Sequence, residues 1–285
     1  MIKTTNVLKL NKTNSLEITN LFWLKHIYIF QKICNFTAAM TLDKKVTPYK
    51  DSSLNKKEQV EKMFDTISGN YDGLNRLISF GTDLKWRKKV LKYIIQHQPE
   101  SILDIATGTG DLAIKFAEKT EASEIIGLDL SEGMLSVAKK KVIDTKLESK
   151  INFIKGDSEA LPFDKNSFSA ITVSFGIRNF DNLEKGLSEI LRVLKPNGLL
   201  IILETSLPTK FPYKQGYQFH SKILLPIIGK LFSKDKVAYN YLSESASIFP
   251  YGTKLNNILQ NIGFINVKNK PQTFGVATIY TATKL

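Results

Sequence analysis

The sequence has one cysteine and only three histidines in 285 residues. Cys34 has no second cysteine with which to form a disulfide, and a lone thiol cannot build a cysteine-based metal site. The histidines, His26, His97 and His220, lie far apart in the chain and show no metal-ligand spacing. We therefore expect no metal site and a fold stabilised by its apolar core, for which the chain is long enough.

The chain also has few acidic residues for its many basic ones. It carries 40 lysine and arginine residues against 27 aspartate and glutamate residues, a formal net charge of +13. Lysine supplies most of this charge, and no stretch interleaves arginine with aromatic residues as an RNA-binding face does. The balance predicts a lysine-rich solvated surface, leaves contact with anionic lipid open, and argues against nucleic acid as a partner.

The N-terminal residues 1–39 lack an apolar run that could cross a membrane. Their apolar patch, Leu21–Phe36, is short and is interrupted by lysine, histidine and glutamine. It also lacks the clean apolar core and the small-residue cleavage site of a secretory signal. We expect residues 1–39 to be a disordered extension or a start-site artefact, and the chain beginning at Met40 to keep its fold and activity. A surface-lying amphipathic anchor stays open.

Apolar spacing divides the rest of the chain into a helical part and an alternating part. Residues 40–98 predict a helical N-terminal cap. In residues 99–285 apolar runs alternate with helical patterns. Strands are expected at 101–106, 124–129, 151–156, 168–175 and 199–203, with a closing hairpin near 267–270 and 277–283. Strict alternation predicts a doubly wound α/β sheet whose ligand site lies at the carboxyl ends of the strands.

The most informative segment is Ile102–Asp111, in which an apolar run leads into a small-residue turn and then into a helical pattern. A strand, a tight turn and a helix in this order let the backbone approach a nucleotide-like ligand, here at Gly108 and Thr109. Asp104 lies inside the strand, and Asp129 ends the next apolar run. The segment is therefore the expected cofactor-binding turn.

Two cofactors fit this turn. The run Gly108–Ala113 satisfies the dinucleotide pattern, with Asp129 about 20 residues on to hold a ribose. Asp111 would then repel a pyrophosphate at the helix N-terminus. S-adenosylmethionine (SAM) has no phosphate and carries cationic groups, and the acid ahead of the turn, Asp104, suits it. The pattern favours SAM, and with it the seven-stranded, Rossmann-like fold of class I SAM-dependent methyltransferases with a helical cap.

Polar residues at further strand ends are the candidate ligands of SAM. Asp129 is expected to accept hydrogen bonds from both ribose hydroxyls. Asp157 is placed to accept from the adenine amino group, while the backbone of Ser158 donates to a ring nitrogen. Ser174 ends the fourth strand and should lie close to the cofactor, with Arg178 emerging beside the reacting methyl group.

Five segments of the chain carry a resemblance to a known family. They are Phe64–Asp72, Asp104–Asp111, Leu161–Phe163, Ser174–Asn179 and Arg192–Gly198. From about residue 46 to its C-terminus the chain resembles the ubiquinone/menaquinone biosynthesis C-methyltransferase family, and within it the bacterial demethylmenaquinone methyltransferases. The block Ser-Phe-Gly-Ile-Arg-Asn is the most specific of the five. The turn departs from many methyltransferases in having Ala106-Thr107 where they have glycine.

The resemblance implies that SAM methylates a ring carbon of a polyprenylated quinol, converting demethylmenaquinol to menaquinol. A ubiquinone precursor as substrate, a small-molecule O- or N-methyltransferase and a non-catalytic SAM-binding protein stay open. A ring carbon becomes nucleophilic when a ring hydroxyl ionises, and Arg178 is expected to stabilise that phenolate. Tyr71 and Asp72 are candidates for closing the pocket or relaying the proton. No histidine is expected at the carboxyl edge of the sheet, so a water-mediated base stays open.

A helical insertion is expected at about residues 208–250, and its composition fits an apolar substrate. Its apolar side chains are predicted to admit the polyprenyl tail, and its lysines to meet anionic lipid headgroups. The resemblance thus implies a cytoplasmic protein that associates peripherally with the inner face of the membrane. A homo-oligomer stays open.

Overall fold

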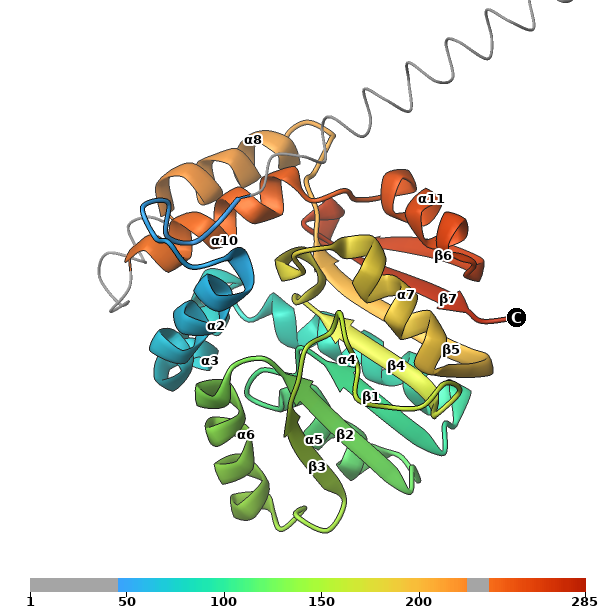
Figure 1. The fold of residues 1–285 in the computed structure, drawn as a ribbon. Helices are drawn as coiled ribbons and strands as arrows, with labels where there is room; N and C mark the ends of the chain where they lie inside the picture. Colours follow the sequence, from blue (N-terminus) through green and yellow to red (C-terminus); the bar gives the residue numbers. More distant parts are fainter. Residues whose placement is uncertain (1–45, 225–235) are drawn as a thin grey trace, which may run out of the picture. The chain divides into compact units, whose positions relative to one another are not determined.

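A seven-stranded sheet lies at the centre of the computed structural model, which describes residues 46–224 and 236–285 (Figure 1). The strand order is β3-β2-β1-β4-β5-β7-β6. The strands are β1 (Ser101–Ile105), β2 (Glu124–Asp129), β3 (Ile151–Lys155), β4 (Phe168–Ser174), β5 (Leu194–Thr205), β6 (Ile265–Gln272) and β7 (Ala277–Thr283). The expectations for residues 1–39, and for the part of the insertion at 225–235, lie outside the described residues.

The direction of the strands follows the predicted topology. β1 to β5 run parallel, and β7 is antiparallel to both of its neighbours, β5 and β6. All five residues of β1 are buried, as expected of a parallel strand that is covered on both faces. The doubly wound α/β architecture with an antiparallel final strand is therefore confirmed.

β5 is longer than the sequence pattern predicts. The apolar run covers residues 199–203, whereas the strand begins at Leu194. Its pairing with β4 shifts between Phe168 and Ala170, so that the intervening Lys-Pro-Asn-Gly stretch forms an irregular step in the ladder. Proline and glycine ordinarily end a strand pattern, and a bulge is the structure that accommodates them inside one.

Helices cover both faces of the sheet (Figure 1). One face carries α4 (Thr82–His97), α5 (Asp111–Lys119) and α6 (Glu132–Thr145), and the other carries α7 (Leu183–Val193) and α11 (Thr253–Ile262). Successive strand residues point to opposite faces, so Ile102 joins the first layer and Leu103 the second. α4 falls in the range 40–98 expected as the cap, yet it packs on the sheet through fully buried Val90 and Ile94.

Two segments that are far apart in the sequence form the helical cap. They contribute α2 (Lys56–Ile67), α3 (Tyr71–Ile78), α8 (Tyr213–Phe219) and α10 (Lys236–Ile248). α2 begins at a capping box in which Asn55 and Glu58 each accept from the other's backbone amide. Its apolar face packs in a third core cluster that joins α2, α3 and α10 to Met134 of α6. No helix of the described residues is long and apolar enough to cross a membrane.

Candidate active site

The turn after β1 has an unusual backbone that brings it close to its neighbours. Ala106, Gly108 and Gly110 adopt positive φ angles of 52°, 58° and 77°. A side chain at Gly110 would place its Cβ 2.9 Å from the ring of Phe153, so only glycine fits there. The turn leads directly into α5, as the strand, turn and helix pattern predicts. Backbone amides are thereby presented at the carboxyl edge of the sheet.

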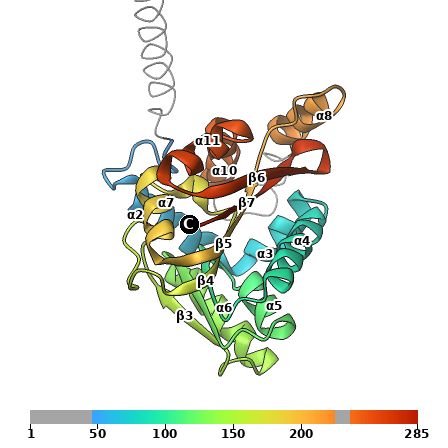
Figure 2. The ribbon, with the colours of Figure 1, turned by 90° about the vertical axis from the view of Figure 1, so that its right-hand side faces the viewer.

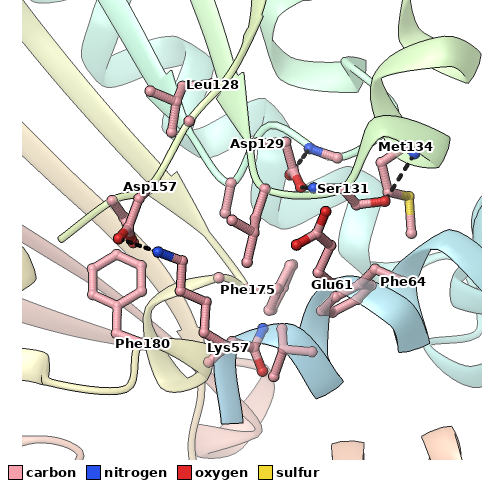
Figure 3. Close-up of a pocket in the computed structure, with 18 of the residues that line it drawn as sticks. Lys57, Glu61, Phe64, Leu128, Asp129, Ser131, Met134, Asp157, Phe175 and Phe180 are labelled. Carbon is pink, nitrogen blue, oxygen red and sulfur yellow. Dashed lines mark hydrogen bonds and ion pairs between the residues drawn. The ribbon is translucent and has the colours of Figure 1, made fainter. Parts of the chain in front are cut away.

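Asp129 lies at the end of β2 and faces this turn. Its two carboxylate oxygens accept hydrogen bonds from the backbone amides of Gly108, at 2.8 Å, and of Ser131, at 2.9 Å (Figure 3). Burial of the carboxyl group raises its pKa to about 6, although these two amides and that of Leu130 act in the opposite direction. A buried acid with a perturbed pKa at a strand end is typical of a functional site.

A cavity of about 740 Å³, here called the first cavity, opens at the ends of β1 to β4 beneath α2. The strand ends contribute the polar part of its lining. They bring together Gly108, Asp129, Asp157, Ser158 and Ser174. Five of the six residues expected to contact the cofactor thus line one cavity, because parallel strands end at the same edge of the sheet.

The sixth expected residue, Thr109, does not line the first cavity. Its hydroxyl donates to Asp72 at 2.7 Å, and its side chain is buried. Ser174 differs from it, since its buried hydroxyl has no hydrogen-bond partner among the described residues. A buried hydroxyl without a partner is costly, and a ligand in the cavity would supply one.

α2 contacts the first cavity through Lys57, which the sequence did not single out. Its ammonium group lies 2.5 Å from a carboxylate oxygen of Asp157, while the other oxygen accepts from the backbone amide of Glu159 (Figure 3). Asp65 of the same helix accepts from Ser131 and Gly133. The N-terminal cap is therefore tied by polar contacts to the edge of the cavity.

A second cavity of about 930 Å³ lies beside the first, between α3, α4, α8 and α10. Tyr71 and Phe175 line both cavities, so these two side chains stand where one meets the other. The rest of its lining includes Trp86, Arg87, Arg178, Tyr217 and His220. Two ligands seated in the two cavities would meet at Tyr71 and Phe175.

Arg178 lines the second cavity and is held by an acid. Its guanidinium donates to Glu204 at 2.7 Å and to the backbone oxygen of Phe175 at 2.7 Å, and Glu204 is fully buried. The Nε of Arg178 is buried and has no hydrogen-bond partner among the described residues. Sequence reasoning missed Glu204, although an acid that follows a buried apolar run at the end of a strand is a usable signal.

Arg87 on α4 is a second guanidinium in the second cavity, and sequence reasoning also missed it. Its Nε lies 3.8 Å from the nearest oxygen of Asp83, beyond hydrogen-bond distance, and is buried without a partner among the described residues. The guanidinium carbon lies 5.7 Å from the centre of the Phe175 ring, within the range of a cation–π contact. The cavity wall thus presents two arginine side chains.

Tyr71 and Asp72 are neighbours in sequence but face different partners. Tyr71 begins α3 and lines both cavities, and burial raises the pKa of its hydroxyl group. Asp72 lines neither cavity; it accepts from Thr109 at 2.7 Å and pairs with Lys141 at 2.5 Å. The structure therefore separates the two candidates for proton relay, and it uses Asp72 as a tie between α3 and the turn.

His220 stands in the wall of the second cavity, where no histidine was expected. It comes from the insertion rather than from a strand end, and its Nε2 lies 3.0 Å from the backbone oxygen of Ile78. Reasoning from strand ends alone could not find it. Its approach to the cavity depends on how the insertion folds over the sheet.

Comparison with known proteins gives these features a family context. The model described as the ubiE/COQ5 methyltransferase family matches residues 52–284. The chain is 47% identical to a demethylmenaquinone methyltransferase of Bacteroides fragilis, over 84% of this chain and 98% of that one. It is 42% identical to a ubiquinone/menaquinone biosynthesis C-methyltransferase of Geobacter sulfurreducens, over 85% of this chain and 94% of that one.

A solved structure supports the fold. The chain matches a SAM-dependent methyltransferase from Thermotoga maritima with a TM-score of 0.56 at 19% identity, over 79% of this chain and 99% of that one. Together with the strand order, this likeness confirms the class I SAM-dependent methyltransferase fold predicted from the sequence.

Proposed function

The chain belongs to the ubiE/COQ5 methyltransferase family, and from this premise we propose that it transfers the methyl group of SAM to a ring carbon of demethylmenaquinol. The observation that carries the proposal is the junction of two cavities at Tyr71 and Phe175. A cofactor in the first cavity and a quinol ring in the second would place donor and acceptor face to face. Methyl transfer is an in-line displacement, so such alignment is most of what catalysis requires.

The residues of the first cavity fit SAM, which supplies an activated methyl group on a sulfonium when it is bound. Asp129 would accept from the ribose hydroxyls, and Asp157 and Ser158 would hold the adenine. The hydroxyl of Ser174, buried and without a partner among the described residues, offers a further polar contact. The cavity is also lined by Val60 and Phe64 of α2, which would exclude water from a bound cofactor.

The second cavity provides what an aromatic carbon nucleophile needs. A free phenol ionises near pH ~10, so a quinol hydroxyl must be stabilised as its anion in order to activate the adjacent ring carbon. The guanidinium groups of Arg178 and Arg87 can donate hydrogen bonds to that oxygen and stabilise its negative charge. Tyr71, whose pKa is raised, keeps its proton near neutral pH and acts as a hydrogen-bond donor rather than as the base.

A third cavity, here called the outer cavity, gives the polyprenyl tail a path. It spans about 1030 Å³, part of it open to solvent, and shares Ile78, Trp86, Tyr217 and His220 with the second cavity. Tyr213 and Phe274 line it and stack with their ring centres 3.8 Å apart. Since the tail of such a quinol resides in lipid, we also propose that the enzyme works at the membrane surface on the cytoplasmic side.

The proposed reaction is tested with the purified full chain, SAM and two short-chain substrates. We expect the naphthoquinol, demethylmenaquinol, to be methylated on carbon, and the benzoquinol precursor of ubiquinone to turn over more slowly. Mass spectrometry locates the added methyl group. Exclusive O-methylation, or faster turnover of the benzoquinol, would overturn the proposed substrate. SAM binding without turnover of either quinol would instead support a non-catalytic role.

Binding of SAM is expected to weaken as the pH falls below about 6. The pKa of Asp129 is raised to about 6, so the folded chain holds this proton more tightly than an unfolded one, and the ribose-binding carboxylate predominates only above that pH. The apparent Kd should then rise about tenfold for each pH unit below 6. Calorimetric titration across this range measures it, with Asp129→Asn as the control that should lack the dependence. Equal slopes would assign the titration to another group.

A further inference from the structure

We propose that the surface around the outer cavity is a docking face for an anionic lipid bilayer; this rests on the proposed polyprenyl substrate. The face is defined by four phenylalanines on three separate segments. They are Phe80 in the α3–α4 turn, Phe211 and Phe219 at the two ends of the α8 segment, and Phe274 in the β6–β7 turn. Figure 2 shows α8 at an edge of the molecule, beside the end of β6 and β7.

The four phenylalanine side chains are largely exposed to solvent, although burial of an aromatic ring is favourable. Phe80 is 72% exposed, Phe211 80%, Phe274 66% and Phe219 55%. Single exposed apolar residues are ordinary, but several large aromatics gathered on one face mark an interaction site. Aromatic side chains are enriched where proteins contact the interface of a lipid bilayer.

Contacts between the three segments hold the face together. The rings of Phe80 and His220 lie 5.8 Å apart, which joins the α3–α4 turn to the residue that follows α8. Tyr213 of α8 stacks on Phe274 of the β6–β7 turn. Phe80 and Phe274 also line the outer cavity, so two of the four exposed rings stand at its mouth, and Phe211 and Phe219 lie at the ends of the helix segment that contributes Tyr213 and Tyr217 to its wall. The docking face is therefore continuous with the outer cavity, the proposed path of the polyprenyl tail.

The exposed charges next to Phe211 in the sequence are basic. The sequence contains no acidic residue between Glu204 and Asp235, and none after Glu244. The same stretches contain many lysines, of which Lys210 and Lys214 flank Phe211 and are exposed. Asp83, the acid near Phe80, is buried and pairs with Arg76. A basic surface with exposed aromatics complements anionic headgroups over acyl chains.

A bilayer fits this face better than a second copy of the chain. Two copies docked through it would set lysines against lysines, and the mouth of the outer cavity would be closed. A bilayer would neutralise the lysines, bury the aromatics and supply the polyprenyl tail directly to the cavity mouth. The quinol ring could then reach the second cavity while its tail stays out of water.

The test uses full-length protein, with residues 1–45 present throughout, and vesicles of phosphatidylcholine with or without phosphatidylglycerol. The variant Phe211→Ser/Phe219→Ser changes two side chains that line none of the three cavities. The control Ile95→Ser/Ile143→Ser changes two exposed apolar residues on α4 and α6. We expect co-sedimentation of the first variant with the anionic vesicles to fall by about tenfold or more, and that of the control to match the wild type.

Further measurements separate docking from catalysis. Lys210→Glu/Lys214→Glu should remove the preference for anionic vesicles. Both variants should keep wild-type turnover of a water-soluble, prenyl-free naphthoquinol and lose turnover of vesicle-borne demethylmenaquinol. Wild-type vesicle binding by both variants would overturn the docking face, as would a wild-type dimer that Phe211→Ser/Phe219→Ser dissociates. If instead the proposed function is wrong, the wild type should turn over neither naphthoquinol substrate, while its binding to vesicles stays intact.

Discussion

Replacing Asp129 with alanine is expected to weaken SAM binding by about 2–3 kcal/mol, roughly 30- to 160-fold in Kd. The carboxylate lies at the end of β2, where one oxygen accepts from the backbone amide of Gly108 in the turn after β1 and the other from that of Ser131. Its loss would remove the proposed acceptor of the ribose hydroxyls and would leave the amides of Gly108 and Ser131 without this acceptor. Isothermal titration calorimetry of SAM against wild-type and variant proteins gives the difference directly.

Two further variants separate ligand binding from folding in this prediction. Asp129→Asn keeps the shape and one oxygen acceptor, so it should hold the turn better than alanine while losing the charge. Asp144→Asn on α6 removes an exposed carboxylate outside the first cavity and should bind SAM as the wild type does. SAM affinity unchanged in both Asp129 variants would exclude this residue from the ribose site.

The gathering of polar residues in the first cavity could be predicted because it follows from topology. Parallel strands end at one edge, so acids and serines that terminate apolar runs must come together there. Asp129, Asp157 and Ser174 do so. The first and last residues of β2 and β7 could also be predicted. Each strand is an uninterrupted strand-like stretch of sequence, bounded by residues typical of turns or helices. Local pattern was sufficient for these features.

The pairing of charged residues could not be predicted from local pattern, because the two members of each pair lie far apart in the sequence. Lys57 and Asp157 are 100 positions apart, and Arg178 and Glu204 are 26 apart. Arg87 reaches Phe175 from a helix that the spacing alone assigned to the cap. The spacing of apolar residues along one segment carries no information about such contacts. The packing of α2 and α4 against the strand ends brings Lys57 and Arg87 to their partners, and the pairing of β4 with β5 brings Arg178 to Glu204.

Replacing Arg178 with glutamine is expected to lower kcat by a factor of about 100 or more while leaving SAM affinity nearly intact. Arg178 lines the second cavity and not the first, so in the proposed reaction its guanidinium would act on the quinol oxygen rather than on the cofactor. Without that cation the quinol hydroxyl should ionise at higher pH in the complex, and kcat should keep rising toward alkaline pH. The measurement is the pH profile of kcat together with a SAM titration.

The control must account for the buried ion pair that this substitution breaks. Glu204 is fully buried, and an acid left without its partner destabilises the fold. Arg178→Gln/Glu204→Gln removes both charges and should restore the melting temperature without restoring kcat. Arg192→Gln breaks another Arg–Glu pair, also at 2.7 Å but outside both cavities, and should leave the pH profile unchanged. Recovery of kcat in the double variant would show that Arg178 is structural, and an equal loss of SAM binding would assign it to the cofactor.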